Sequence, residues 1–230
     1  MVATPQSLLE PYFPAARKLI GVVPRSGFHF LIVSGCSSAG KDVLVAETLR
    51  RVGTDAEMLR KYMTRSRRLG EADYCTSLSV AQFEKAEKAG KIIFPYHKRG
   101  CRYGFDTDDF LSAVKHGVCK IAVFTELTAV PQIVTALREN GLLASAIFVD
   151  VERQYLVRRS YHRNFGDNEV LKRLESVDQD LNTLAARTMK LREEYYVVQN
   201  NEGEPFNMVK DNMEELVRRA IAGKLPWPPA

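Results

Sequence analysis

The stretch GCSSAGKD, at residues 35–42, decides the fold. It has the pattern G-x-x-x-x-G-K, in which glycines let the backbone wrap closely around phosphate oxygens and the lysine neutralises their charge. An apolar run at residues 28–33 comes directly before it and fits a buried strand, and residues 42–51 follow at helical spacing. A strand before the loop and a helix after it are the context that a phosphate-binding P-loop requires. The sequence therefore predicts an ATP phosphate site here.

The individual residues of this loop predict its contacts. Lys41 would lie between the β and γ phosphates, and the helix N-terminus would add the positive end of its dipole. Asp42 stands where the motif commonly has Ser or Thr, whose hydroxyl binds Mg²⁺. A carboxylate also binds Mg²⁺, so Asp42 is the expected metal ligand; the alternative is that it only begins the helix. The expected ATP-binding residues are Gly35, Ser37, Ser38, Ala39, Gly40, Lys41 and Asp42.

Apolar runs alternate with helical patterns along the rest of the chain. Further strands are expected at 58–64, 92–96, 119–124, 142–149 and 195–198, and further helices at 79–90, 107–116, 131–140, 151–163, 168–194 and 206–223. This alternation predicts an α/β fold, a three-layer P-loop sandwich with a mainly parallel sheet.

Composition places the chain among globular proteins. It has 230 residues, of which 45% are hydrophobic and 27% charged, and this is too apolar for intrinsic disorder. No apolar run approaches the ~18 residues of a membrane helix, and the N-terminus lacks a secretory pattern. The four cysteines form no CxxC pair, which favours a reducing compartment. We expect a cytoplasmic protein without a membrane partner.

The net charge of +5 is concentrated in one segment. Residues 50–68 hold seven basic and two acidic side chains, a surplus that equals the charge of the whole chain. A local cluster in a neutral background favours a small anion over nucleic acid, and the interleaved aromatic residues of a base-stacking surface are missing. A solvated basic loop is the alternative.

Further motifs give the chain a resemblance to the guanylate kinase family. Residues 63–74, MTRSRRLGEADY, follow that family's T-T-R-x-x-R, G-E and D-Y pattern, with Met for the first Thr and a shortened loop. A Y-G pair at 103–104, an R-L pair at 173–174 and an N-N pair at 200–201 stand where the family has Y-G, R-L and N-D. The match runs over residues 28–217.

The resemblance implies an ATP- and Mg²⁺-dependent kinase that moves the γ-phosphoryl group onto the phosphate of a small acceptor, a nucleoside monophosphate or a phosphosugar. It implies a small acceptor-binding insertion at about 61–106 and a helical lid at about 155–175. Both lie in a kinase domain at 27–223, between an N-terminal arm at 1–26 and a tail at 224–230. The sequence gives no expectation for the oligomeric state.

The same resemblance assigns roles to residues outside the loop. Two guanidinium groups and two phenols would surround the acceptor's phosphate, and arginines of the lid would spread the charge of the transferred group. The expected acceptor-binding residues are Thr64, Arg65, Arg68, Tyr74, His97 and Tyr103. The expected catalytic residues are Lys41, Arg159, Arg163 and Arg173.

Two departures from the family argue against GMP as the acceptor. Phe94 stands where guanylate kinases have a Glu that reads the guanine edge, and Val123 stands where they have an Asp. A guanine N–H group facing these side chains would lose its hydrogen-bond partner, at a cost of about 1–3 kcal/mol.

A second family shares some of the changes. Ribose 1,5-bisphosphate phosphokinases are similar to this chain in their G-K-D loop, their Y-x-T-R segment and their W-H-x-x-G-x-x-Y-G stretch, which corresponds to residues 96–104 with Tyr for Trp. Their N-G-S-R motif is absent at 124–127. The acceptor therefore stays open. The competing hypothesis is an inactive kinase fold that binds a phosphorylated or acidic partner, and the intact Lys41 and lid arginines argue against it.

Overall fold

The main sheet consists of parallel strands, and the P-loop follows the carboxyl end of the middle one. The computed structural model describes residues 23–67, 73–162, 167–185, 193–203 and 205–227. In spatial order, the five strands of this sheet are β2 (Ala56–Met58), β7 (Cys119–Val123), β1 (His29–Ser34), β8 (Ala144–Asp150) and β9 (Tyr196–Gln199). All pairings between them are parallel. Both β1 and β7 are buried along their whole length, as strands covered on both faces must be.

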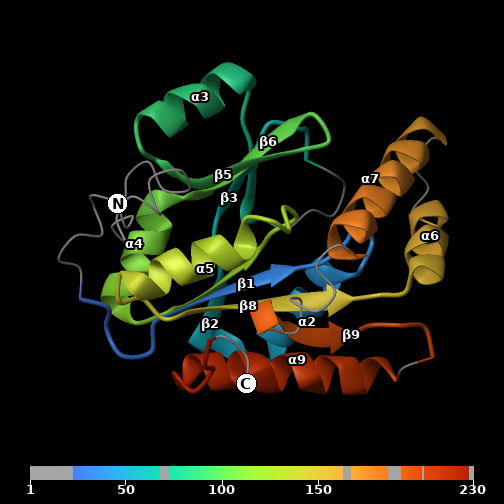
Figure 1. The fold of residues 1–230 in the computed structure, drawn as a ribbon. Helices are drawn as coiled ribbons and strands as arrows, with labels where there is room; N and C mark the ends of the chain where they lie inside the picture. Colours follow the sequence, from blue (N-terminus) through green and yellow to red (C-terminus); the bar gives the residue numbers. More distant parts are fainter. Residues whose placement is uncertain (1–22, 68–72, 163–166, 186–192, 204, 228–230) are drawn as a thin grey trace, which may run out of the picture.

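Helices cover both faces of this sheet (Figure 1). On one side, α2 (Lys41–Val52) packs against α9 (Phe206–Ile221), and both contact β1. On the other side, α5 (Val130–Glu139) lies over β8, and α4 (Thr107–His116) contacts β7. The predicted three-layer α/β sandwich with a parallel sheet is therefore confirmed.

A smaller mixed sheet stands beside the main one. Its strands, in spatial order, are β4 (Cys75–Ser77), β3 (Lys61–Met63), β6 (Cys101–Asp106) and β5 (Ile92–Lys98). The helix α3 (Val80–Lys88) lies over its outer side (Figure 1) and begins with a capping box between Ser79 and Gln82. The small insertion expected from the sequence is therefore present as a mixed sheet.

The single strand expected at 58–64 is wrong, because the chain changes sheets there. The Leu59 N–H donates to the Ile121 carbonyl in the main sheet, and the Lys61 N–H donates to the Tyr74 carbonyl in the small one. Residues 58–64 thus supply the end of β2 and all of β3. The pattern of apolar side chains does not mark such a change, since both strands are extended.

A bulge in β5 decides where Phe94 points. The pairing of β5 with β6 shifts register between Ile93 and Tyr96, and Phe94 has a φ of 50°. The Phe94 ring is fully buried in the core, where it stacks on Phe30 and meets Phe110 edge to face. Phe94 therefore does not face an acceptor, which corrects the interpretation made from its place in the sequence.

Two helices stand at one end of the sandwich, where a lid was expected. They are α6 (Arg153–Tyr161) and α7 (Asp167–Ala185), which pack against each other (Figure 1). Residues 1–22 of the predicted N-terminal arm and residues 186–192 of the predicted long helix lie outside the described residues. Of the predicted tail, Leu225 is buried and Trp227 packs against the core. None of the helices described is both long and apolar enough to cross a membrane.

Candidate active site

The P-loop leaves the end of β1 through glycines in backbone conformations that other residues rarely adopt. Gly35 has a φ of 144°, and a Cβ atom there would lie 2.5 Å from the Val149 carbonyl oxygen of β8. Gly40 has a φ of 84° and forms the N-cap of α2. These two conformations turn the chain sharply from strand to helix, so that the first turn of α2 lies at the carboxyl ends of the strands.

Lys41 begins α2 and its ammonium turns back toward the loop. Its Nζ donates to the carbonyl oxygens of Gly35 at 2.8 Å and of Cys36 at 2.7 Å. Burial lowers the pKa of Lys41 to about 8, and attraction to Asp42 offsets only part of this effect. Among the described residues, no carboxylate forms an ion pair with it. A buried cation without a carboxylate partner is suited to bind an anion from solution.

The loop is held in place by neighbours from β9 and α6. Asn200 follows β9, and its side-chain amide donates to the Ala39 carbonyl at 2.8 Å. The Ser38 hydroxyl lies 2.9 Å from the Ser160 hydroxyl of α6. Arg159, also on α6, donates to the Asn200 carbonyl at 2.8 Å. The predicted catalytic Arg159 therefore lies beside the P-loop, positioned through Asn200.

A cavity of about 730 Å³ extends from the P-loop to the small sheet. It is of a size that holds a small-molecule ligand. Its charged lining is mostly basic: of the described residues, five cations and one carboxylate contribute. These are Lys41, Lys61, Arg65, Arg99, Arg173 and Asp42. The cavity is therefore suited to a polyanion such as a nucleotide with a second phosphorylated molecule.

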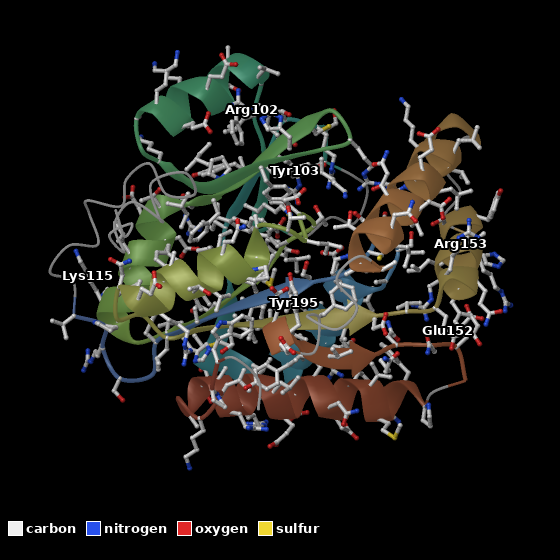
Figure 2. All side chains as sticks on the ribbon, in the orientation of Figure 1. Arg102, Tyr103, Lys115, Glu152, Arg153 and Tyr195 are labelled. Carbon is white, nitrogen blue, oxygen red and sulfur yellow. The ribbon has the colours of Figure 1, made fainter. Side chains whose placement is uncertain are left out.

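Three of the predicted acceptor-binding residues meet on one wall of this cavity. Arg65, Tyr74 and Tyr103 all line it. Burial raises the pKa of Tyr103, and a hydrogen bond to Arg65 opposes that shift. Tyr103 and its neighbour Arg102 lie on opposite faces of β6 (Figure 2), and Arg102 pairs with Glu84 and Glu87 of α3 instead.

The other predicted acceptor-binding residues lie elsewhere. The Thr64 hydroxyl accepts the backbone N–H of Arg102 at 2.9 Å, and Thr64 is not part of the cavity lining. The His97 side chain is exposed on β5 and also lies outside the lining. Arg68 falls outside the described residues. Roles for these three in binding stay predictions.

On the lid side, Arg173 reaches the cavity from α7. Its side chain is 1% exposed and contributes to the lining. Arg163 lies outside the described residues, so its catalytic role stays a prediction. Arg158 is exposed and pairs with Glu202, which agrees with its place on a solvated helix face.

Asp42 fits a magnesium ligand by its place. It is the second residue of α2, its side chain is exposed, and it lines the cavity next to Lys41. No group of three or more His, Cys, Asp or Glu residues that could hold a metal occurs in the described part of the chain. Mg²⁺ in phosphate-transfer sites is commonly bound by one or two carboxylates together with substrate phosphates and water. The residues present therefore fit this ion.

Sequence reasoning missed two cations of the cavity. Lys61 lies on β3, two residues before the buried Met63 and four before Arg65, and this alternation could have placed it on the same face. Arg99 occupies the two-residue turn between β5 and β6, where it and Gly100 have φ values of 51° and 72°. The contact of Arg99 with the Ser37 hydroxyl, at 3.4 Å, was not expected from the sequence.

The same turn region also contacts α7. Lys98, the last residue of β5, donates to Asp180 of α7 at 2.5 Å, and both side chains are largely buried. The tip of the small sheet thus touches the P-loop through Arg99 and α7 through Lys98.

Comparison with known proteins identifies the fold. No family model matches the sequence, and no curated protein matches it. Among solved structures, the crystal structure of guanylate kinase from Anaplasma phagocytophilum is similar, with a TM-score of 0.62 and 18% sequence identity. The alignment covers 89% of this chain and 90% of that chain. The chain therefore has a guanylate kinase-like fold, as the sequence motifs indicated.

Proposed function

From this guanylate kinase-like fold, we propose that the protein is an ATP- and Mg²⁺-dependent phosphotransferase. It moves the γ-phosphoryl group of ATP onto the phosphate of a small phosphorylated acceptor, a nucleoside monophosphate or a phosphosugar. The observation that carries this proposal is the single cavity shared by Lys41 of the P-loop, Arg65 and Tyr103 of the small sheet, and Arg173 of the lid side.

The arrangement supports transfer by positioning and electrostatics. Lys41 and the loop amides hold the donor phosphates, while Arg65, Tyr74 and Tyr103 hold the acceptor's phosphate. The attacking phosphate oxygen is already anionic, so no general base is needed. Arg173 is buried in the lining of the same cavity and stabilises the negative charge on the transferred group. Helices α6 and α7 exclude water and so limit hydrolysis of ATP.

Magnesium has a place in this proposal beside the donor phosphates. The Asp42 carboxylate would hold the ion, directly or through water, since it lines the cavity next to Lys41. When bound, Mg²⁺ supplies positive charge that neutralises the phosphate oxygens.

The lining argues against GMP as the acceptor. Val123 does line the cavity, and Phe94 does not. Among the described lining residues, the one carboxylate is Asp42, which belongs to the donor side. A guanine edge presents N–H donors, and no described lining residue on the acceptor side offers them a carboxylate.

The test is a transfer assay with purified protein, ATP, Mg²⁺ and a panel of nucleoside monophosphates and phosphosugars. Lys41→Ala is expected to abolish transfer, and Arg65→Ala to raise the acceptor KM with little change in the ATP KM. Arg50→Ala is the matched control: Arg50 belongs to the same basic segment, but it is exposed, pairs with Glu47 and lies outside the cavity.

Two outcomes would contradict the proposal. Transfer that survives in Lys41→Ala would show that the P-loop does not hold the donor. Tight binding of ATP and of phosphorylated molecules without transfer to any of them would favour a binding module that uses the same arginines.

A further inference from the structure

We propose that Lys61 binds a second anionic group of the acceptor, a phosphate or a carboxylate, at the end remote from the phosphate that Arg65 holds. The inference rests on the proposed function for the identity of the cavity's ligand. Lys61 has no role in the sequence motifs discussed above.

The surroundings of Lys61 keep it charged without giving it an ion-pair partner among the described residues. Its Nζ donates to the Val123 carbonyl at 3.0 Å. It lies 5.2 Å from the ring centre of Tyr103 and 5.6 Å from those of Tyr96 and Phe105. No described carboxylate forms an ion pair with it. Burial lowers the pKa of Lys61, but attraction to Tyr96 and Asp42 outweighs this effect, and the net pKa is raised. Lys61 is therefore a cation at neutral pH.

Two other lysines, the partly buried Lys98 and the buried Lys120, provide the comparison. Lys98 pairs with Asp180 at 2.5 Å, and Lys120 lies 2.8 Å from both Glu57 and Asp109. Neither of these lysines lines the cavity.

The lysines that do line the described cavity are Lys41 and Lys61, and neither forms an ion pair with a described carboxylate. A cation that lines a cavity without a carboxylate partner is available to pair with an anionic group of the ligand. For Lys41 that ligand is the donor phosphate. By the same reasoning, the ligand of Lys61 is also anionic.

The geometry separates this anion from the first acceptor phosphate. Lys61 lies near the ring of Tyr103, whereas Arg65 bonds to its hydroxyl, so the two cations meet different parts of this side chain. An acceptor lying along Tyr103 therefore meets one cation at each end. A second polar group is at hand, since the Tyr96 hydroxyl is buried beside Lys61.

The experiment uses acceptors that differ only in the second anion. The pairs are ribose 1,5-bisphosphate with ribose 5-phosphate, and 3-phosphoglycerate with glycerol 3-phosphate, which distinguish a second phosphate from a carboxylate. Binding of each is measured by calorimetry with a non-hydrolysable ATP analogue present, and transfer is measured with ATP. The variants are Lys61→Met, which keeps the length without the charge, and Lys61→Arg, which keeps the charge.

Wild type is expected to bind the two-anion member of at least one pair more tightly. Lys61→Met should lose about 10- to 100-fold of that affinity, as for a charge-assisted hydrogen bond, and change the single-phosphate member less than about twofold. Lys61→Arg should retain most of the preference. The inference is overturned if wild type shows no preference in either pair, or if Lys61→Met weakens both members equally. A preference that depends on Lys61 but leads to no transfer would support this inference and contradict the proposed function.

Discussion

Replacing Lys41 with Met is expected to stabilise the unliganded protein while abolishing ATP binding. The pKa of Lys41 falls from 10.5 to about 8 on burial. Each unit corresponds to about 1.4 kcal/mol, so the buried charge costs roughly 3 kcal/mol of folding free energy below pH 8. Methionine removes this cost but also the two hydrogen bonds to the carbonyls of Gly35 and Cys36. A net gain of about 1–2 kcal/mol is expected, or roughly 2–8 °C in Tm for a chain of this length.

The stability difference between wild type and Lys41→Met is expected to depend on pH. Because the folded-state pKa of Lys41 lies below the unfolded one, the folded protein binds fewer protons between pH 8 and about pH 10.5. The destabilisation is complete below pH 8 and disappears as the pH rises through that window. Thermal unfolding of wild type and Lys41→Met at pH 7, 8.5 and 10 should therefore show a Tm difference that shrinks with pH.

A second buried lysine serves as the control. Lys120 donates to Glu57 and Asp109 at 2.8 Å each, so Lys120→Met should lower the stability at pH 7. If Lys41→Met were less stable than wild type at pH 7, or if its advantage did not change up to pH 10, the reasoning about an uncompensated charge would be refuted.

Three further predictions follow from the contacts around the site. Asp180→Asn should leave Lys98 without a counterion and lower the unfolding free energy by about 3 kcal/mol in urea titrations; an unchanged midpoint would mean that the pair is not formed in solution. Phe94→Glu should cost more than about 3 kcal/mol, because the ring fills the core; a stable variant that accepts GMP would instead place residue 94 in the cavity. Asn200→Ala should raise the ATP KM about tenfold by releasing the Ala39 carbonyl, with a small change in acceptor KM; equal effects on both substrates would contradict a role limited to the loop.

Much of the fold follows from local sequence. A P-loop sandwich is specified by the strand at 28–33, the glycines of the loop and the amphipathic helix after it. The strand and the helix bury their apolar faces against each other, and the glycines allow the sharp turn between them. The helix expected at 107–116 has those bounds in the structure. The strand pairing of residues 58–64 was not predictable in this way, because it depends on partners far along the chain.

The residues of the candidate site also differ in whether local sequence predicts them. Lys41 and Asp42 are given by a contiguous motif, and Arg65 and Tyr103 by short motifs around them. The direction of Phe94 depends on a bulge in β5, which the sequence gives only as a proline at position 95. The role of Arg99 depends on how a hairpin tip folds back onto the P-loop, and the charge of Lys61 becomes informative only once its lack of a carboxylate partner is seen.

The turn between β5 and β6 has a consequence for how the molecule opens. Lys98 and Asp180 are 82 residues apart in sequence, and their pair ties the small sheet to the helix that carries Arg173. Any motion that widens the cavity at this corner must separate that pair and hydrate both charges. The small sheet and α7 are therefore held together by an ion pair, and added salt, which screens separated charges more than joined ones, should favour a form in which the two part.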